Sequence, residues 1–373
     1  MSKLNISRLT NENEDGAPYI SGITTFSSTA FLEPPKGNTA QRPEYVKPGM
    51  IRFNTDSAHL EYYNGVEWTE VLVANNTLDG GNRGVFGGGY APGVYLDVIE
   101  YITISSTGNS INFGDLIVGK DRFSGCSSST RGVFGGGIGS NPHPRFDVIE
   151  FITISSTGDA QDFGDLSGTR DNMSACSSST RGVFGGGLSP TSINTIEYIT
   201  IASTGDVKDF GDLVDTKSNT GSCSSSTRGV FGGGQSPSLF NAIDFITIAS
   251  TGHAADFGEF SSGISARSSC SSSTRGVFAG GYSPTYRSAI NFITISTLGN
   301  AADFGDLSAV AVLIGASSSS IRGVFGGGVR QPAGITDTIE YITISSTGNS
   351  IDFGDLIGIK SATVAFSNGH GGL

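Results

Sequence analysis

Arginine and carboxylate side chains recur at fixed intervals along this 373-residue chain and are the first candidates for chemistry. One arginine opens each copy of the motif Arg-Gly-Val-Phe, and one acid follows each Phe-Gly farther along. The two sets are Arg83, Arg131, Arg181, Arg228, Arg275 and Arg322, and Asp115, Asp165, Asp212, Glu259, Asp306 and Asp355. A ring of six cations is able to bind an anion. We expect instead that the arginines pair with these acids or cap backbone carbonyl groups.

A second set of acids stands near the start of the apolar segment that follows each arginine: Glu100, Glu150, Glu197, Asp244 and Glu340, with Asn291 in the fifth copy. One acid per repeat is too widely spaced for a carboxylate pair unless all of them face one axis, so no catalytic or metal site is predicted. The four histidines occupy unrelated positions, and neither zinc-ligand spacing, a nucleophile elbow nor a phosphate loop is present. The sequence predicts a protein that is not an enzyme and has no cofactor. A glycan-cleaving enzyme is the alternative that the many carboxylates leave open.

The elements that position these residues form a repeat of 47–50 residues, a period typical of repeat architectures. The third copy, residues 174–213, contains four short apolar segments with glycine-containing turns between them, which predicts a four-stranded antiparallel sheet, the blade of a β-propeller. The first segment occurs only five times before an arginine, and residues 360–369 align with residues 170–179 to supply the sixth. We therefore expect an all-β fold, a six-bladed propeller over residues 83–373 whose ring is closed by the C-terminal strand.

The four cysteines, Cys126, Cys176, Cys223 and Cys270, each lie five residues before an arginine, and Ser317 holds the fifth equivalent position. Equivalent positions in a circular array point alike rather than toward each other. The sequence therefore predicts small buried thiols and no disulfides. The glycine triplet of the motif is expected to leave room where backbones crowd near the hub.

Charge and composition narrow the range of partners. The net charge is −12 and no run of lysine or arginine occurs, which disfavours nucleic acid and anionic membrane surfaces. No stretch approaches the length of a membrane span and the first residues lack a signal-peptide core, so we expect synthesis in the cytoplasm. Before the repeats we expect an extended arm over residues 1–48, a small β-meander over 49–73 and a linker over 74–82.

Two of the four connections in each repeat are near-identical between copies, whereas the other two vary in length and content. In an up-and-down sheet the variable connections emerge on one face, which is therefore the diversified face. The predicted contact residues on these loops are Tyr90, Tyr95, His143, Arg145, Phe146, Leu239, Phe240, Tyr282, Tyr286, Arg287 and Arg330. Large, stiff side chains suit contact with either a sugar or a protein. Packing of the aromatic residues onto their own loops is the alternative.

The run GMIRFNTDSAHLEYYNGVEW, preceded by PPKGNTAQRP, resembles a short module of tailed-bacteriophage structural proteins, those of marine cyanobacterial phages among them. The resemblance covers roughly residues 34–73 and is strongest for tail-fibre and other virion surface proteins. It implies a docking or oligomerisation module. Its candidate docking residues are Arg52, Phe53, Tyr62, Tyr63 and Trp68. A cap that only covers an exposed sheet edge is the alternative.

The repeat itself resembles the kelch repeat, in which an apolar strand closed by glycines precedes an apolar-aromatic strand and an aromatic strand that ends in leucine. Kelch units are similar in length and build β-propellers. This chain departs from them by carrying phenylalanine where kelch repeats usually have tryptophan, at Phe113, Phe163, Phe210, Phe257, Phe304 and Phe353.

Together the two resemblances imply a bacteriophage virion structural protein, a tail fibre or tail appendage first and a capsid decoration protein second. Its partners would be other virion proteins through residues 1–75 and a host-surface glycan or protein through the propeller loops. We expect the chain to form a homo-oligomer or to be present in several copies in the particle. A cellular kelch-like adaptor is a further alternative, against which the N-terminal module speaks.

Overall fold

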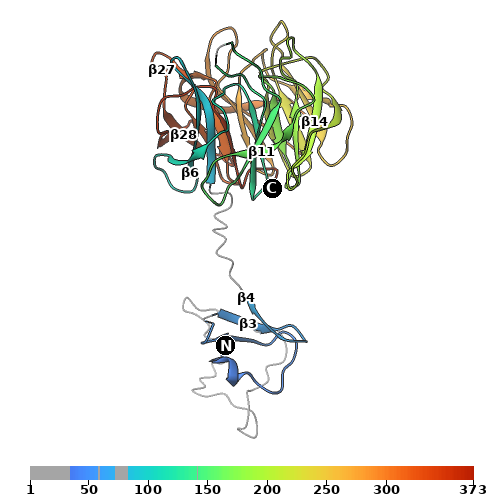
Figure 1. Ribbon diagram of the computed structural model, residues 1–373, viewed down its shortest axis with the longest axis vertical. Helices are drawn as coiled ribbons and strands as arrows, with labels where there is room; N and C mark the ends of the chain where they lie inside the picture. Colours follow the sequence, from blue (N-terminus) through green and yellow to red (C-terminus); the bar gives the residue numbers. More distant parts are fainter. Residues whose placement is uncertain (1–33, 58, 72–82, 141) are drawn as a thin grey trace, which may run out of the picture. The chain divides into compact units, whose positions relative to one another are not determined.

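The computed structural model describes residues 34–57, 59–71, 83–140 and 142–373 (Figure 1). The chain divides into two compact units, residues 1–75 and 76–373. The described part is almost entirely β-structure, and its one helix is the short 3-10 helix η1 (Thr39–Gln41). No helix in this part is long and apolar enough to cross a membrane.

The first unit contains a four-stranded sheet in the order β1 (Lys36–Gly37), β2 (Ile51–Asn54), β3 (His59–Tyr63) and β4 (Trp68–Val71). The meander β2–β3–β4 is antiparallel, whereas β1 pairs with β2 in parallel. The Asn64 side chain accepts hydrogen bonds from the Val66 and Glu67 amides, and Gly65 has φ +105°, which favours glycine. The expected Asn-Gly turn between the second and third meander strands is confirmed.

A polar cluster ties residues before the meander to this sheet. Glu61 is fully buried and accepts hydrogen bonds from Arg42 Nη2 at 2.6 Å, Arg52 Nη1 at 3.1 Å and Asn54 Nδ2 at 3.2 Å. A buried carboxylate needs such partners, so the chain that carries Arg42 has to fold back onto the sheet. Residues 34–48 therefore belong to the folded module rather than to an extended arm. The rest of the predicted arm lies outside the described residues.

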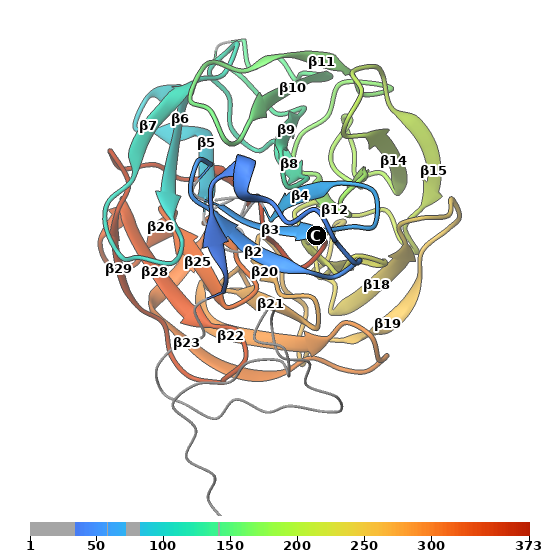
Figure 2. The ribbon, with the colours of Figure 1, turned by 90° about the horizontal axis from the view of Figure 1, so that it is seen from below.

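The described part of the second unit contains six repeat sheets, and each has at least four strands in antiparallel order. Sheet I contains β30 (Val364–Ser367), β5 (Arg83–Ala91), β6 (Val94–Thr103) and β7 (Ile111–Asp115), and sheet II contains β8 (Ser124–Ser127), β9 (Arg131–Gly135), β10 (Val148–Thr153) and β11 (Gln161–Asp165). Sheet III contains β12 (Ser174–Ser177), β13 (Arg181–Gly185), β14 (Thr195–Thr200) and β15 (Lys208–Asp212), and sheet IV contains β16 (Gly221–Ser224), β17 (Arg228–Gly232), β18 (Ala242–Thr247) and β19 (Ala255–Glu259). Sheet V contains β20 (Ser268–Ser271), β21 (Arg275–Ala279), β22 (Arg287–Thr294) and β23 (Ala302–Val312), and sheet VI contains β24 (Gly315–Ser318), β25 (Arg322–Gly326), β28 (Thr338–Thr343) and β29 (Ile351–Asp355). Figure 2 shows the sheets following one another around a common axis.

The strand expected from the C-terminal segment is present. β30 pairs with β5 and places Val364 opposite Gly87 and Ser367 opposite Gly84, so residues far apart in sequence share sheet I. Sheet V differs from the prediction, because the hairpin β26 (Val329–Arg330) and β27 (Gly334–Ile335) adds two strands at the end of β23. β23 is long enough to accept the hairpin because extended backbone continues to Val312, where the other repeats turn.

Phenylalanines of the Arg-Gly-Val-Phe motif fill the space between neighbouring sheets. The Phe134 ring lies 2.8 Å from the point where a Cβ on Gly87 would be, and Phe184 lies 3.0 Å from the same point on Gly135. The first glycine of the triplet is therefore small because of an aromatic ring from the next sheet. The second and third are required by conformation, with φ +67° at Gly186 and +106° at Gly187.

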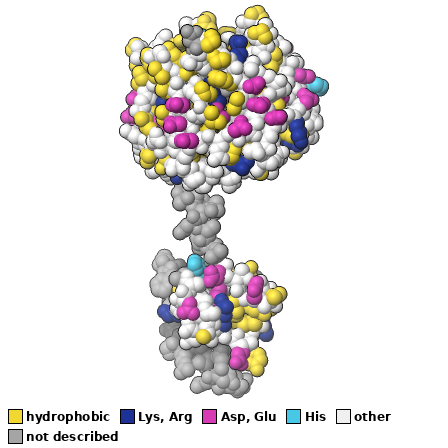
Figure 3. Space-filling model, in the orientation of Figure 1, with side chains coloured by type: hydrophobic (Ala, Val, Ile, Leu, Met, Phe, Trp, Pro, Cys, Tyr) yellow, Lys and Arg dark blue, Asp and Glu magenta, His cyan; other side chains and the backbone are white. Residues whose placement is uncertain are grey.

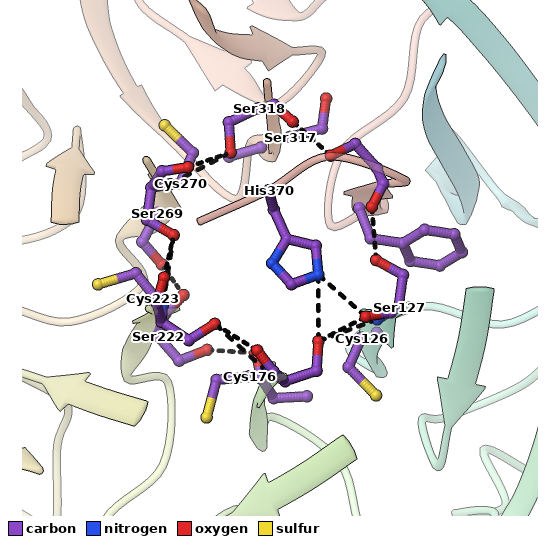
Figure 4. A pocket seen from close by; sticks show the side chains of 18 of the residues that line it. Cys126, Ser127, Cys176, Ser222, Cys223, Ser269, Cys270, Ser317, Ser318 and His370 are labelled. Carbon is purple, nitrogen blue, oxygen red and sulfur yellow. Dashed lines mark hydrogen bonds between the residues drawn. The ribbon is translucent and has the colours of Figure 1, made fainter. Parts of the chain in front are cut away.

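Six serines on the innermost strands are joined in cyclic order by side-chain to backbone hydrogen bonds (Figure 4). Each hydroxyl donates to the carbonyl oxygen of the serine before it, and the first member of the set donates to the last. The serines are Ser127, Ser177, Ser224, Ser271, Ser318 and Ser367. His370 lies at the centre of this arrangement, with Nε2 2.9 Å from the Ser127 carbonyl oxygen. These contacts link the last sheet to the first.

Candidate contact site on the variable-loop face

The six motif arginines cap backbone carbonyl groups, which was one of the two expectations for them. Arg83 Nη1 donates to the Ile154 oxygen of sheet II at 2.7 Å, and Arg322 Nη1 donates to the Ile104 oxygen of sheet I at 3.1 Å. Each guanidinium also lies over an aromatic ring of its own sheet at 4.3–4.5 Å. The predicted pairing with the Phe-Gly acids is wrong, because Asp115 stands opposite Val98 at the other end of the sheet.

The second set of acids forms buried ion pairs with lysine and arginine side chains from other segments of the chain. Lys120 Nζ lies 2.7 Å from Glu150, and Lys217 Nζ lies 2.7 Å from Asp244. The remaining pairs are Arg170–Glu197, Arg330–Glu340 and Lys360–Glu100. Each pair has at most 4% of either side chain exposed, so these acids are structural groups of the sheet core.

Arg330 is therefore not the contact residue that the sequence suggested. Its side chain is 3% exposed and its Nη1 contacts Glu340 in the core of sheet VI. The sixth repeat has Ala311 where the second has Lys120, so the acid lacks a base at the usual position. The loop that carries Arg330 supplies the missing cation.

Sheet V has lost both members of the pair, with Ile264 and Asn291 in their places. An unpaired cation is nevertheless buried in this sheet. Arg267 is 5% exposed, its Nη2 donates to the Phe278 and Ala289 carbonyl oxygens at 2.9 and 3.0 Å, and its Nε and Nη1 have no partner. Burial lowers the pKa of Arg267 to about 9.

The predicted thiols are buried and free in all four cases. Burial raises the pKa of Cys126 to about 12, which leaves the thiol protonated and unreactive at neutral pH. The Cys126 sulfur lies 2.5 Å from the point where a Cβ on Gly182 of the next sheet would be. The thiol and the glycine of the Arg-Gly pair therefore fill one space between sheets.

Most of the other predicted contact residues lie partly or fully exposed on their loops. Tyr282 and Tyr286 form an edge-to-face pair with centroids 6.3 Å apart, and exposed Arg287 donates to the Ser283 carbonyl oxygen. Others are partly buried on their own loops or sheets, namely Arg145, Phe146, Leu239 and Phe240. Packing within the loop thus accounts for part of the predicted set.

Three predicted residues from two different segments come together at one hollow. Tyr90, near the end of β5, and Tyr95, near the start of β6, have ring centroids 5.5 Å apart in an edge-to-face pair. The Tyr95 hydroxyl lies 3.0 Å from Nδ1 of His143, which comes from the loop between β9 and β10. The hollow has a volume of about 810 Å³, and Val329 and Ile335 of the β26–β27 hairpin also line it.

Asp121 and Arg122 also line this hollow, and neither was among the predicted residues. Asp121 is 5% exposed, its Oδ2 lies 3.7 Å from Arg122 Nε, and its Oδ1 has no hydrogen-bond partner. Burial raises the pKa of Asp121 to about 6, opposed by Arg122 and assisted by Asp171. Aligning the repeats places Asp121 level with Asp171, and this is the sequence signal that would have found it.

The docking residues of the first unit divide between its interior and its surface. Arg52 is 5% exposed and bonded to Glu61, so it is a core residue of the module. The Tyr63 ring packs on Trp68 with centroids 5.7 Å apart. Tyr62 is 38% exposed and stands opposite Ile51, itself 53% exposed. Partly buried Phe53 lies between Arg52 and Asn54 on β2.

Comparison with known proteins gives no family, since neither a protein-family model nor a curated protein matches the chain. The arrangement of its own residues is therefore the basis for a functional assignment.

Proposed function

We propose that this chain is a non-enzymatic structural protein of a bacteriophage virion, a tail fibre or tail appendage, that makes contact through its variable loops. In this proposal the six repeat sheets are the blades of a kelch-like β-propeller closed by β30, and the first unit docks the chain onto the particle or onto other copies of itself. The sequence resemblances of residues 34–73 and of the repeat support the class of protein.

Contacts that recur from sheet to sheet support the propeller. The serine bonds, the arginine caps and the Phe-Gly contacts each recur around the set, and the last sheet makes them with the first. Pairing of β30 with β5 gives sheet I the four-strand order of the other sheets, which supports a closed ring.

The observation that carries the contact role is the difference between the two faces of the repeat unit. Turns such as Ser-Thr-Arg-Gly are nearly the same in each repeat, whereas the opposite loops differ and form an 810 Å³ hollow with aromatic residues at Tyr90, Tyr95 and His143. A conserved framework with one varied, aromatic face is typical of recognition surfaces. The exposed pair Ile51 and Tyr62 gives the first unit an apolar surface for docking.

The test is a phage that encodes the chain without residues 1–75. The second unit is compact by itself, so we expect it to fold, as circular dichroism of the purified fragment would show, but to be absent from purified particles. Loop substitutions in the full chain should leave incorporation unchanged and reduce adsorption to host cells. Normal incorporation of the shortened chain would contradict the docking role.

Two further readouts separate the alternatives. Antibody labelling of intact particles places the chain on the tail, as proposed, or on the head, as a decoration protein would be. Incubation with host polysaccharide distinguishes a binding protein from a depolymerase, because only an enzyme shortens the glycan.

A further inference from the structure

The molecule contains two copies of one local arrangement, and only one of them is complete. Asp121 and Asp171 occupy equivalent positions, and the amide of each donates to the carbonyl oxygen of the residue that follows a glycine triplet, Ile138 and Leu188 respectively. Asp171 is covered by Arg145 of the preceding sheet, whose Nε lies 2.6 Å from the carboxylate. The residue equivalent to Arg145 beside Asp121 is Tyr95. This follows because the Arg170 amide donates to the carbonyl oxygen of Phe146, the residue after Arg145, and the Lys120 amide donates to that of Leu96, the residue after Tyr95.

The carboxylate of Asp121 is consequently buried without the guanidinium that its counterpart has. Asp121 is 5% exposed and Asp171 is 1% exposed, so both carboxylates are largely withdrawn from water. Neighbouring Arg122 does not replace the missing cation, because its Nε is 3.7 Å from Asp121 and its side chain is 48% exposed. A buried carboxylate without a close partner is costly unless a cation covers it.

We propose that the hollow formed by Tyr90, Tyr95, His143 and Asp121 binds an arginine side chain of a partner protein, whose guanidinium takes the place beside Asp121 that Arg145 takes beside Asp171. This inference rests on the proposed contact function of the variable loops and names the chemistry of the partner.

The walls of the hollow suit this ligand. Guanidinium groups stack on aromatic faces, and this molecule uses that contact at each motif arginine, with distances of 4.3–4.5 Å to the ring centroid. The Tyr90 and Tyr95 rings line the same hollow as the carboxylate, and Val329 and Ile335 offer an apolar wall for the aliphatic part of the side chain. Acidic side chains spread over the side of the second unit in Figure 3 and the net charge of −12 also favour approach of a cation.

The experiment measures binding of the tripeptide acetyl-Gly-Arg-Gly-amide to the full chain by ligand-observed NMR titration. The matched neutral probe has citrulline in place of arginine, which keeps the shape and removes the charge. The site variant is Asp121→Ser, which introduces the residue found at the equivalent positions Ser218, Ser265 and Ser361 and is therefore compatible with the fold. The control is Asp171→Ser, which changes the carboxylate already covered by Arg145.

We expect the wild-type chain and Asp171→Ser to bind the arginine peptide alike, and both Asp121→Ser and the citrulline probe to weaken binding at least tenfold. Equal binding of the two peptides, unchanged binding by Asp121→Ser or no binding to the wild type would overturn the proposal. A chain that fails these tests but is still found on particles and needed for adsorption leaves the proposed function intact. Absence of the chain from particles would instead reject the function, whatever the peptide result.

Discussion

Replacing Arg267 with methionine should stabilise the protein, although it removes two hydrogen bonds. The chain itself offers the substitution, because Met173 occupies the equivalent position in sheet III. Arg267 is the cation left in sheet V, where Ile264 and Asn291 stand in place of the base and acid of the other sheets. Its guanidinium packs 4.8 Å from the Phe260 ring centroid without a carboxylate.

The magnitude follows from the burial of the charge. The pKa of Arg267 falls from 12.5 to about 9, and at about 1.4 kcal/mol per pKa unit the charged form costs on the order of 5 kcal/mol in the folded protein. Methionine leaves the Phe278 carbonyl oxygen without the guanidinium, which offsets about 1–3 kcal/mol, whereas the Ala289 oxygen keeps its bond from the Gly280 amide. The expected net gain is about 2–4 kcal/mol.

Urea unfolding of the full chain at neutral pH measures this gain, with Arg170→Met as the control. Arg170 is equally buried but paired with Glu197, so its loss leaves a buried carboxylate and should cost about 3–5 kcal/mol. Between the folded pKa of about 9 and the unfolded value of 12.5 the unfolded chain binds more protons, so wild-type stability rises with pH in that window. The advantage of Arg267→Met should therefore shrink at about pH 10. A destabilised variant, or a gain that does not change with pH, would refute the reasoning.

Two other substitutions test the site and the core. Asp121→Ser should be more stable than the wild type at neutral pH and lose this advantage at about pH 4. The pKa of Asp121 is about 6 in the folded chain and 3.8 in the unfolded chain, so protonation between these values favours the folded wild type. Thermal unfolding across this pH range measures the difference, and a difference that does not change with pH would contradict a destabilising buried charge at Asp121. Gly125→Ala should cost about 1–3 kcal/mol because its Cβ would lie 2.8 Å from Phe366, whereas Ala175→Gly at the equivalent position should cost about 1 kcal/mol or less in the same unfolding measurement.

The repeat made the strand order predictable before the structure. Residues 360–369 were expected to complete the sheet that begins at Arg83, and the register of β30 on β5 confirms this pairing. The prediction succeeded because each strand recurs with the same neighbours in sequence. The first strand is missing only before Arg83, so the unpaired C-terminal segment can complete only that sheet. The hairpin β26–β27 corresponds to single bridges in other repeats, such as Ile138 with Arg145 and Leu188 with Ser192, and only here does the pairing extend to two strands, which the period did not predict.

Side-chain partners were harder to predict because they depend on which end of a strand a residue occupies. Asp115 was paired with Arg83 because each repeat has one such acid and one such arginine. Antiparallel pairing nevertheless puts the two residues at opposite ends of sheet I. Arg330 was assigned to the surface because its loop varies between repeats. Since Ala311 replaces the base of this repeat, Glu340 requires a cation from elsewhere, and Arg330 provides it. Comparison of charged positions across repeats, rather than within one repeat, would have indicated that pair.

Compensation between repeats separates structural from functional variation in this molecule. In sheet V the base and the acid are both replaced, by Ile264 and Asn291. In the sixth repeat Arg330 supplies the cation that is missing at Ala311, and Gly125 leaves space for the Phe366 ring, so each of these changes is compensated within the protein. Arg267 is a buried charge without a carboxylate partner, and the buried Asp121 has only the exposed Arg122 near it, at 3.7 Å.

The two uncompensated charges differ in what surrounds them. Arg267 donates to carbonyl oxygens of its own sheet and packs on Phe260, so the protein interior already surrounds it. Asp121 lines an 810 Å³ hollow together with two tyrosines, which leaves space beside it for a group from another molecule. A buried carboxylate at such a hollow, with only the exposed Arg122 near it at 3.7 Å, has a binding partner as its simplest physical explanation, because the equivalent carboxylate one sheet farther on is covered by an arginine at 2.6 Å.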